Sequence, residues 1–388
     1  MRPFVYHQPT RVLFGRGRLE QVGEIVAPYG RRCLLVTVPV NDVIGPLVQR
    51  VGTALAKSEV AWEHFAGVIA NPTTDVVTAG SEMARAFSAD VVLGVGGGSS
   101  MDTAKAIAVE AVHPGSSWDY LYFRDRQPTE KTLPIVAVST TSGTGSHVTQ
   151  VAVITNPAEK TKSAIYNPVV FPRSCIVDPE LVLSAPPHLT ASTGFDVFCH
   201  AFESYLHSNA SPHTDMLALE AIQIVAKHLP AAVEDGSDVV VREKMAWADT
   251  LAGLAIANAG VTLPHGIGMT IGGQCPHVMH GEALAVVYPE FTRFTWEAAT
   301  ERFAAVGRIF NPKLGGKSDA FAAHACCDEL DAFLRRIGMW LSFDSLDVSE
   351  ADIVEIADKS RILPDYRNNP RIATREEIYE MLLRSRSR

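Results

Sequence analysis

The sequence predicts a chain in two parts, an α/β part built on a parallel sheet and then an all-α part. In the first half, short apolar runs alternate with amphipathic segments, whereas after about residue 185 only helical patterns remain. At roughly 100–200 residues per domain, 388 residues accommodate two or three domains. The SAPP segment Ser184–Pro187 separates the alternating strand and helix patterns from the purely helical patterns. We therefore expect domains at residues 1–185 and 186–388.

Three short apolar runs in the first half are typical of buried strands. They are Cys33–Val38, Val91–Gly97 and Pro134–Thr140. The amphipathic segments Val43–Lys57 and Thr73–Phe87 lie between them and predict helices. Strands that alternate with helices in this way favour a parallel sheet covered by helices on its faces.

The second half shows helical periodicity and no strong strand pattern. The predicted helices are Thr190–Ser208, Asp215–Glu234, Val241–Ala259, Phe291–Phe310, Lys317–Ile337, Ser349–Ser360 and Thr374–Arg384. Between Thr250 and Gly281 there is no Asp, Glu, Lys or Arg. Pro264, Pro276 and several glycines interrupt this stretch, so we interpret it as a buried helix followed by a buried loop and not as a membrane span.

Composition limits the partners and the compartment. The net charge of -9 argues against nucleic acid or an anionic membrane as a partner. The six cysteines are scattered and form no CxxC pair, which fits reduced thiols in a cytoplasmic protein. The N-terminal residues MRPFVYHQPT contain no apolar segment of the kind found in secretory signals.

A glycine-rich turn follows the second predicted strand. Here the sequence reads GGGSSMDTAKAIA over Gly96–Ala108, and a helix is expected to start near Ser99 or Ser100 with Asp102 in its first turn. Glycines let the backbone approach a ligand closely, and free N–H groups at a helix start bind pyrophosphate. The segment is neither GxGxxG nor a P-loop, and a plain strand-to-helix turn remains the alternative interpretation.

A second polar loop, STTSGTGSHVTQ (Ser139–Gln150), follows the third predicted strand. Its hydroxyls and glycines suit contacts to phosphate or ribose, although such residues also favour ordinary turns. Two such loops after parallel strands strengthen each other, since ligands of open α/β sheets bind at the carboxyl ends of strands. We expect a dinucleotide there.

Histidines and carboxylates gather in two segments of the second half. Asp196 and His200 share one face of a predicted helix, and Glu203 and His207 continue that face. The charge-free stretch adds three more histidines, His265, His277 and His280. One carboxylate with three imidazoles suits a divalent metal such as Fe(II) or Zn(II), but spacing alone does not choose which histidines ligate. A helical polar face in which Asp196 pairs with His200 is the structural alternative.

These segments together resemble the iron-containing (group III) alcohol dehydrogenases along nearly the whole chain. The resemblance lies in FAGVIANPTTD (65–75), GGGSSMDTAKAIA (96–108), TTSGTGSHVTQVAVIT (140–155) and IVDPEL (176–181). It implies an N-terminal dinucleotide-binding α/β domain and a helical C-terminal metal-binding domain, the architecture shared with dehydroquinate synthase-like proteins. It also implies a homodimer or larger homo-oligomer.

The resemblance implies roles for individual residues. By motif match the metal ligands are Asp196, His200, His265 and His280. The implied cofactor-binding residues are Gly97, Gly98, Ser99, Asp102, Lys105, Thr140, Thr141, Ser146 and Lys162. Candidate residues of the substrate pocket are Phe198, Ile256 and Gln150.

Three departures from the family pattern matter. Many members have a proton-relay histidine four residues after the third ligand, where this chain has Met269, so His277 or water is the candidate relay. The spacing from His265 to His280 is one residue longer than expected, which keeps His277 as a rival ligand. Val38 stands where NAD-preferring members often carry an Asp. The absence of that carboxylate favours NADP(H) slightly over NAD(H).

The expected function is hydride transfer between NAD(P)(H) and a small alcohol or aldehyde, with Fe(II), or alternatively Zn(II), in the metal site. A glycerol dehydrogenase-like enzyme and a hydroxyacid–oxoacid transhydrogenase are alternatives on the same architecture. A catalytically silent protein that binds nucleotide or metal is the alternative from another class, and Met269 is the feature in its favour.

Overall fold

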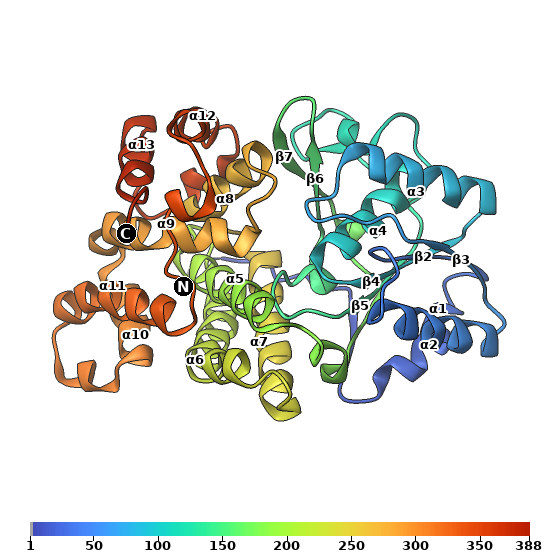
Figure 1. Cartoon of the computed structure of the whole chain (residues 1–388), viewed down its shortest axis with the longest axis horizontal. Helices are drawn as coiled ribbons and strands as arrows, with labels where there is room; N and C mark the ends of the chain where they lie inside the picture. The colour runs from blue at the N-terminus through green and yellow to red at the C-terminus, as the bar shows by residue number, and fades with distance from the viewer. Residues whose placement is uncertain (1–2) are drawn as a thin grey trace. The chain divides into compact units, whose positions relative to one another are not determined.

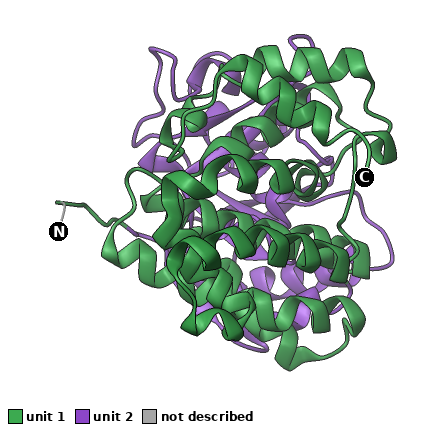
Figure 2. Cartoon of the chain, turned by 90° about the vertical axis from the view of Figure 1, so that its left-hand side faces the viewer, with its two compact units in different colours: residues 1–7, 185–388 green, residues 8–184 purple. Residues whose placement is uncertain are grey.

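The computed structural model describes residues 3–388, and these form two compact units. One unit consists of residues 8–184, and the other of residues 185–388 with the described part of residues 1–7 (Figure 2). The N-terminal segment, which the predicted boundary includes in the first domain, has its contacts with the second unit.

The first unit is built on a six-stranded, wholly parallel sheet with the strand order β1-β8-β5-β4-β2-β3. Figure 1 labels β2, β3, β4 and β5 of this sheet. Its strands are β1 Arg11–Phe14, β2 Arg32–Val36, β3 Ala61–Phe65, β4 Val91–Gly96, β5 Ile135–Ser139 and β8 Ser174–Val177. The three predicted strands are β2, β4 and β5, so these predictions are confirmed. The other three strands were not predicted.

Helices cover both faces of this sheet, as predicted. The helices are α1 Val22–Val26, α2 Ile44–Lys57, α3 Thr74–Phe87 and α4 Gly98–Glu110. Successive strand residues point to opposite faces, so Cys33 and Leu35 of β2 pack in one core with α1 and α2. Leu34 and Val36 of the same strand pack in the other core with α3 and α4. The predicted α/β class is confirmed.

The strand order places the two polar loops side by side. After β3 the chain returns past β2 to form β4, and β5 then pairs with β4 on its other edge. The loops that follow β4 and β5 therefore leave the same carboxyl edge of the sheet, next to the point where the strand order reverses. A separate antiparallel hairpin of β6 (Val151–Asn156) and β7 (Thr161–Tyr166) continues from the second loop.

The second unit is helical, and no strand occurs among its described residues. Its helices are α5 Pro187–Leu206, α6 Pro212–Glu234, α7 Val239–Asn258, α8 Leu263–Gln274, α9 His280–Thr295, α10 Thr300–Phe310, α11 Asp319–Arg336, α12 Glu350–Lys359 and α13 Arg375–Arg384. Helix α5 is buried along most of its length and packs against α6, α7 and α9. The second unit is thus the predicted all-α part of the fold.

Two helix predictions in this unit were wrong in detail. The segment after Asn258, interpreted as a loop, contains helix α8 from Leu263 to Gln274. Pro264 does not break this helix because it occupies its first turn, where a missing N–H has no intrahelical acceptor to lose. The predicted single helix over residues 291–310 is divided by a 3₁₀ turn at Trp296–Ala299.

Among the described residues, one helix, α6, is long enough and apolar enough to cross a membrane, judged by length and composition alone. Half of its apolar window is buried inside the structure, and the helix packs against α5 and α7. The uncharged pair α7 and α8 passes the same test together but is bent by 100° at the break. Such features are shared by the core helices of soluble proteins, so they are weak evidence for a span.

Candidate metal centre and cofactor loops

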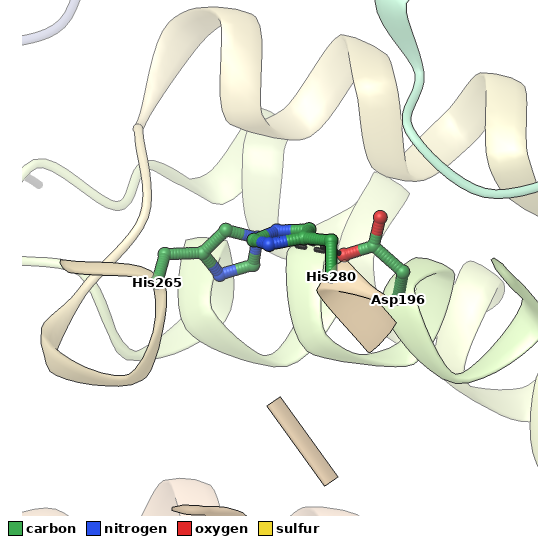
Figure 3. A group of neighbouring side chains, drawn as sticks. All are labelled: Asp196, His265 and His280. Atoms are coloured by element: carbon green, nitrogen blue, oxygen red, sulfur yellow. Dashed lines mark ion pairs between the residues drawn. The ribbon is translucent and has the colours of Figure 1, made fainter. Parts of the chain in front are cut away.

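One carboxylate oxygen of Asp196 is surrounded by three imidazoles. Asp196 and His200 lie one turn apart on α5, His265 lies in the first turn of α8, and His280 is the first residue of α9. The distances from Asp196 Oδ1 to the three histidine Nε2 atoms are 3.7 Å for His200, 3.5 Å for His265 and 3.8 Å for His280. Figure 3 shows His265 and His280 on the side of Asp196 where this oxygen lies.

The polar atoms at the centre of this group lack ordinary partners. Asp196, His200 and His265 are buried, and His280 is partly buried. Asp196 Oδ1 and His265 Nε2 are buried and have no hydrogen-bond partner among the described residues. Such atoms are expensive to bury, and a cation between them would satisfy both. Ligand atoms of Asp196, His265 and His280 lie within 4.8 Å of one another, so the residues fit a divalent metal.

The charges of the group also suit a cation. Burial alone would raise the pKa of Asp196, but His200, His280 and His265 together hold it well below its usual value. Burial lowers the pKa of His265, but Glu203 and Asp196 outweigh this and raise it to about 10. In the metal-free protein a proton on His265 thus offsets the buried negative charge, and a metal that binds Nε2 must displace it.

Two acidic residues beside this group were not among the predicted site residues. Glu203 is completely buried and accepts a hydrogen bond from His265 Nδ1. Asp365 lies in a 3₁₀ turn, Pro364–Asn368, where its carboxylate packs against Gly266 next to His265. Burial raises the pKa of Asp365 to about 6, and Glu203 adds to the rise while His265 opposes it. The helical spacing of Glu203 from Asp196 and His200 was a usable signal, whereas nothing in the sequence marks Asp365.

His277 does not join the group. Its side chain is exposed, and Nε2 makes a 3.0 Å hydrogen bond with the backbone carbonyl of Leu346. The position thus suits neither the rival-ligand role nor the proton-relay role that we considered. Met269, one turn after His265 on α8, is partly buried and has no group that transfers protons. A relay therefore needs water or another residue.

The first cofactor loop forms an open helix terminus. Helix α4 begins at Gly98, one or two residues earlier than predicted, and no side-chain hydrogen bond caps it at Gly97. The Ser100 N–H donates to the Gly97 carbonyl, whereas the N–H groups of Gly98 and Ser99 remain available for an anion. Asp102 lies just beyond the first turn, which corrects its predicted place within that turn. Ser99 is the second residue of the helix and is only partly buried.

Glycines at this turn let the two polar loops pack tightly together. A Cβ on Gly98 would lie 2.5 Å from Thr144 Cγ2, and one on Gly97 would lie 3.1 Å from Thr141 Cγ2. Any side chain at Gly98 would therefore push the second loop away. Thr140 follows β5 directly and donates its N–H to the Gly96 carbonyl, which ties the second loop to the first.

Lys105 stabilises the second loop through buried hydrogen bonds. Its side chain is completely buried, and Nζ donates to the carbonyls of Ser146 (2.7 Å), Thr149 (2.9 Å) and Val151 (2.7 Å) and to Ser146 Oγ (2.8 Å). Ser146 Oγ in turn donates to Asp102 at 2.7 Å. The desolvated ammonium has its pKa lowered to about 8, although Asp102 opposes this effect. Lys105 and Ser146 thus support the loop from within, and their polar groups are used inside the protein.

The remaining predicted residues have definite places. Lys162 lies on β7, is buried, and donates to Asn71 Oδ1 at 2.8 Å. Gln150 is also buried and donates to the hydroxyl of Tyr166. Phe198 is wholly buried among aromatic rings of α5, α9, α10 and α11, so it belongs to the core and not to a pocket. On α5 it lies on a different face from Asp196 and His200, and Ile256 of α7 is partly buried.

Comparison with known proteins identifies the family. The model of the iron-containing alcohol dehydrogenase family matches residues 9–179. The model of the C-terminal part of the Fe-containing alcohol dehydrogenase family matches residues 190–386. Between them the two models account for most of the chain.

Individual relatives match over almost the full length. The NAD-dependent methanol dehydrogenase of Bacillus methanolicus is 33% identical, with 96% of this chain and 97% of that protein covered. The crystal structure of an archaeal halo-thermophilic alcohol dehydrogenase from a Red Sea brine pool is 36% identical, with a TM-score of 0.95 over 99% of this chain and all of that one. Sulfoacetaldehyde reductase from Bifidobacterium kashiwanohense, solved with NAD+, is 33% identical, with a TM-score of 0.87 over the whole of both chains. The chain therefore belongs to the iron-containing alcohol dehydrogenase family.

Proposed function

We propose that this protein is a metal-dependent alcohol dehydrogenase and aldehyde reductase that transfers a hydride between a nicotinamide dinucleotide and a small alcohol or aldehyde. The observation that carries the proposal is the convergence of three imidazole Nε2 atoms on one buried carboxylate oxygen. The relatives support it, because they include a methanol dehydrogenase and a sulfoacetaldehyde reductase, one named for an alcohol and one for an aldehyde.

The chain's own residues have two tasks in this reaction. The uncapped start of α4 and the loop after β5 bind and orient the dinucleotide, with its pyrophosphate at Gly97, Gly98 and Ser99. Asp196, His200, His265 and His280 would hold the metal, a role that their convergence on Asp196 Oδ1 supports. When bound, the metal supplies Lewis-acid polarisation of the alcohol or aldehyde oxygen. The bound nicotinamide would supply the hydride chemistry at the carbinol carbon, and the hydroxyl proton would leave to solvent in the oxidation direction.

We propose Fe(II) as the native metal, as the family description suggests. One carboxylate with three imidazoles also accepts Zn(II), so the donor set alone does not select between the two.

For the cofactor we propose that both NAD(H) and NADP(H) are accepted. The methanol dehydrogenase is named as NAD-dependent, and the sulfoacetaldehyde reductase was solved with NAD+, which supports NAD(H). The partly buried Val38 after β2 presents no carboxylate to repel a 2′-phosphate, and the nearest acid along the chain, Asp42, is exposed. This supports NADP(H) as a second cofactor.

The test is turnover against metal content. Metal-free protein is prepared with a chelator, reloaded with Fe(II), Zn(II) or neither, and assayed for NADH and NADPH oxidation with a panel of small aldehydes. We expect activity only after reloading. Undiminished turnover by fully metal-free protein would show that the metal is not needed.

The same assay separates the alternatives. A hydroxyacid–oxoacid transhydrogenase turns over only when a hydroxyacid and an oxoacid are both present, without net change in NAD(P)H. A glycerol dehydrogenase-like enzyme prefers polyols in the oxidation direction. A catalytically silent protein shows no turnover whether it is metal-free or loaded with Fe(II) or Zn(II). In that case His265→Ala weakens metal binding and has no effect on activity.

We also propose that residues 8–184 and 185–388 act as the dinucleotide-binding and metal-binding domains of a cytoplasmic homodimer or larger homo-oligomer. The six cysteines, all buried and free, support a reducing compartment. Phe4 and Val5 support self-association, because they are apolar and 46% and 86% exposed in the single chain. Light scattering after size-exclusion chromatography tests this, and a monomeric mass would contradict it.

A further inference from the structure

Glu203 is a buried carboxylate with a complete set of donors. It lies on α5, one turn beyond His200, and is fully shielded from solvent. Oε1 accepts hydrogen bonds from His265 Nδ1 at 2.7 Å and from the Tyr288 hydroxyl at 3.2 Å. Oε2 accepts from the Thr262 N–H at 2.8 Å and from the Thr262 hydroxyl at 3.3 Å. Four donors therefore compensate its burial.

Glu203 and its donors belong to the three helices that carry the metal-binding residues or, for Thr262, directly precede one of them. Thr262 is the residue immediately before α8, whose first turn carries His265. Tyr288 lies on α9, the helix that begins at His280. Glu203 itself belongs to α5, which carries Asp196 and His200. One side chain thus links all three elements.

The contact with His265 determines which of its nitrogens is available. Both oxygens of Glu203 accept from the surrounding donors, so His265 Nδ1 is the donor in its 2.7 Å contact and carries a proton. In a neutral imidazole the lone pair is then on Nε2, the atom that lies 3.5 Å from Asp196 Oδ1. The 2.7 Å contact also fixes the plane of the ring.

We propose that Glu203 is the positioning residue of the metal centre, which sets the tautomer and the orientation of His265 and is itself held by Tyr288 and Thr262. The inference rests on the proposed function, because it concerns the same metal. Glu203 touches neither substrate nor cofactor in this assignment. Outer carboxylates of this kind change metal affinity about 10–100-fold when they are replaced.

The test measures metal binding directly. The dissociation constant of Co(II) is determined by competition with a chelator for the wild-type protein and for Glu203→Gln, and the Co(II) absorption spectrum reports the coordination geometry. We expect affinity to fall about 10–100-fold with an altered spectrum. An unchanged affinity together with an unchanged spectrum would overturn the proposal.

Two further variants keep the result interpretable. Tyr288→Phe removes one donor to Glu203 and is the milder change if Glu203→Gln fails to fold; it should alter the Co(II) spectrum with a smaller loss of affinity, and an unaltered spectrum would again overturn the proposal. Glu110→Gln is the matched control, because Glu110 is a buried carboxylate of the other unit that accepts from Ser117 N–H. It should leave Co(II) binding unchanged.

Failure of the proposed function gives a different pattern. If the wild-type protein and His265→Ala bind Co(II) equally weakly, there is no metal centre and the proposed function falls. If the wild-type protein binds Co(II) tightly and His265→Ala does not, the metal centre is present, and the Glu203 variants then test only the role of Glu203.

Discussion

Ionisation of Asp365 should lower the stability of the metal-free protein as the pH rises toward neutral. Burial raises its pKa from 3.8 to about 6 in the folded protein. Between these two values the folded state binds more protons than the unfolded state, so stability falls as pH rises from about 4 to about 6. A rise of that size corresponds to about 3 kcal/mol at pH 7. The side chain is partly exposed, which makes this an upper bound.

Replacing Asp365 by Asn should therefore stabilise the metal-free protein. At pH 7 we expect a gain of about 1–3 kcal/mol, and the gain should shrink toward zero as pH approaches 4. Differential scanning calorimetry of both proteins between pH 4.5 and 8 measures this difference. Asp125→Asn, in an exposed loop of the other unit, is the control and should have no pH-dependent effect.

Metal provides a second arm of this experiment. A cation held beside His265 favours the ionised form of Asp365, so saturating Co(II) should reduce the advantage of the Asn variant. A variant that is equally stable or less stable than the wild-type protein at pH 7 would refute the reasoning. So would a gain that does not change with pH, because it would have another origin than the carboxylate charge.

Two further predictions concern the cofactor loops. Gly98→Ala places a Cβ 2.5 Å from Thr144 Cγ2 and should weaken NADH binding at least about ten-fold, with a loss of about 1–3 kcal/mol in stability, as followed by NADH fluorescence and thermal melts. Gly315→Ala, with no atom within 4 Å of the new Cβ, should bind NADH normally; equal affinity of both variants would contradict the packing argument. Val38→Asp should raise the KM for NADPH relative to NADH at least about ten-fold, since a carboxylate repels the 2′-phosphate. An unchanged ratio in steady-state kinetics would mean that Val38 does not face the ribose.

The three strands that the sequence predicts are all buried on both faces, whereas β8, which is equally buried but only four residues long, was not predicted. β2, β4 and β5 are interior strands, and almost all their side chains are buried, so each is a continuous apolar run. The edge strands β1 and β3 face solvent on one side and include exposed residues, as in AWEHF of β3. Their composition resembles that of loops. These strands form because they pair with a neighbouring strand, and a local sequence pattern does not reveal that pairing.

The metal centre is predictable only in part for a similar reason. Asp196 and His200 lie one turn apart, so their proximity follows from helical geometry alone. His265 and His280 reach the group through the packing of α8 and α9, and His277 is left at the surface by the same packing. The choice of His280 followed from the family resemblance and not from spacing. Asp365 reaches the group only through tertiary contacts, so no sequence pattern could have indicated it.

The buried ammonium of Lys105 has a consequence for cofactor binding. Lys105 Nζ donates hydrogen bonds to three backbone carbonyls between Ser146 and Val151. These bonds fix the conformation of the loop after β5 before any ligand binds. A pre-organised loop loses little conformational entropy on association, so more of the contact energy appears as affinity. Dinucleotides should accordingly bind in a fast single step, without a slow rearrangement of this segment.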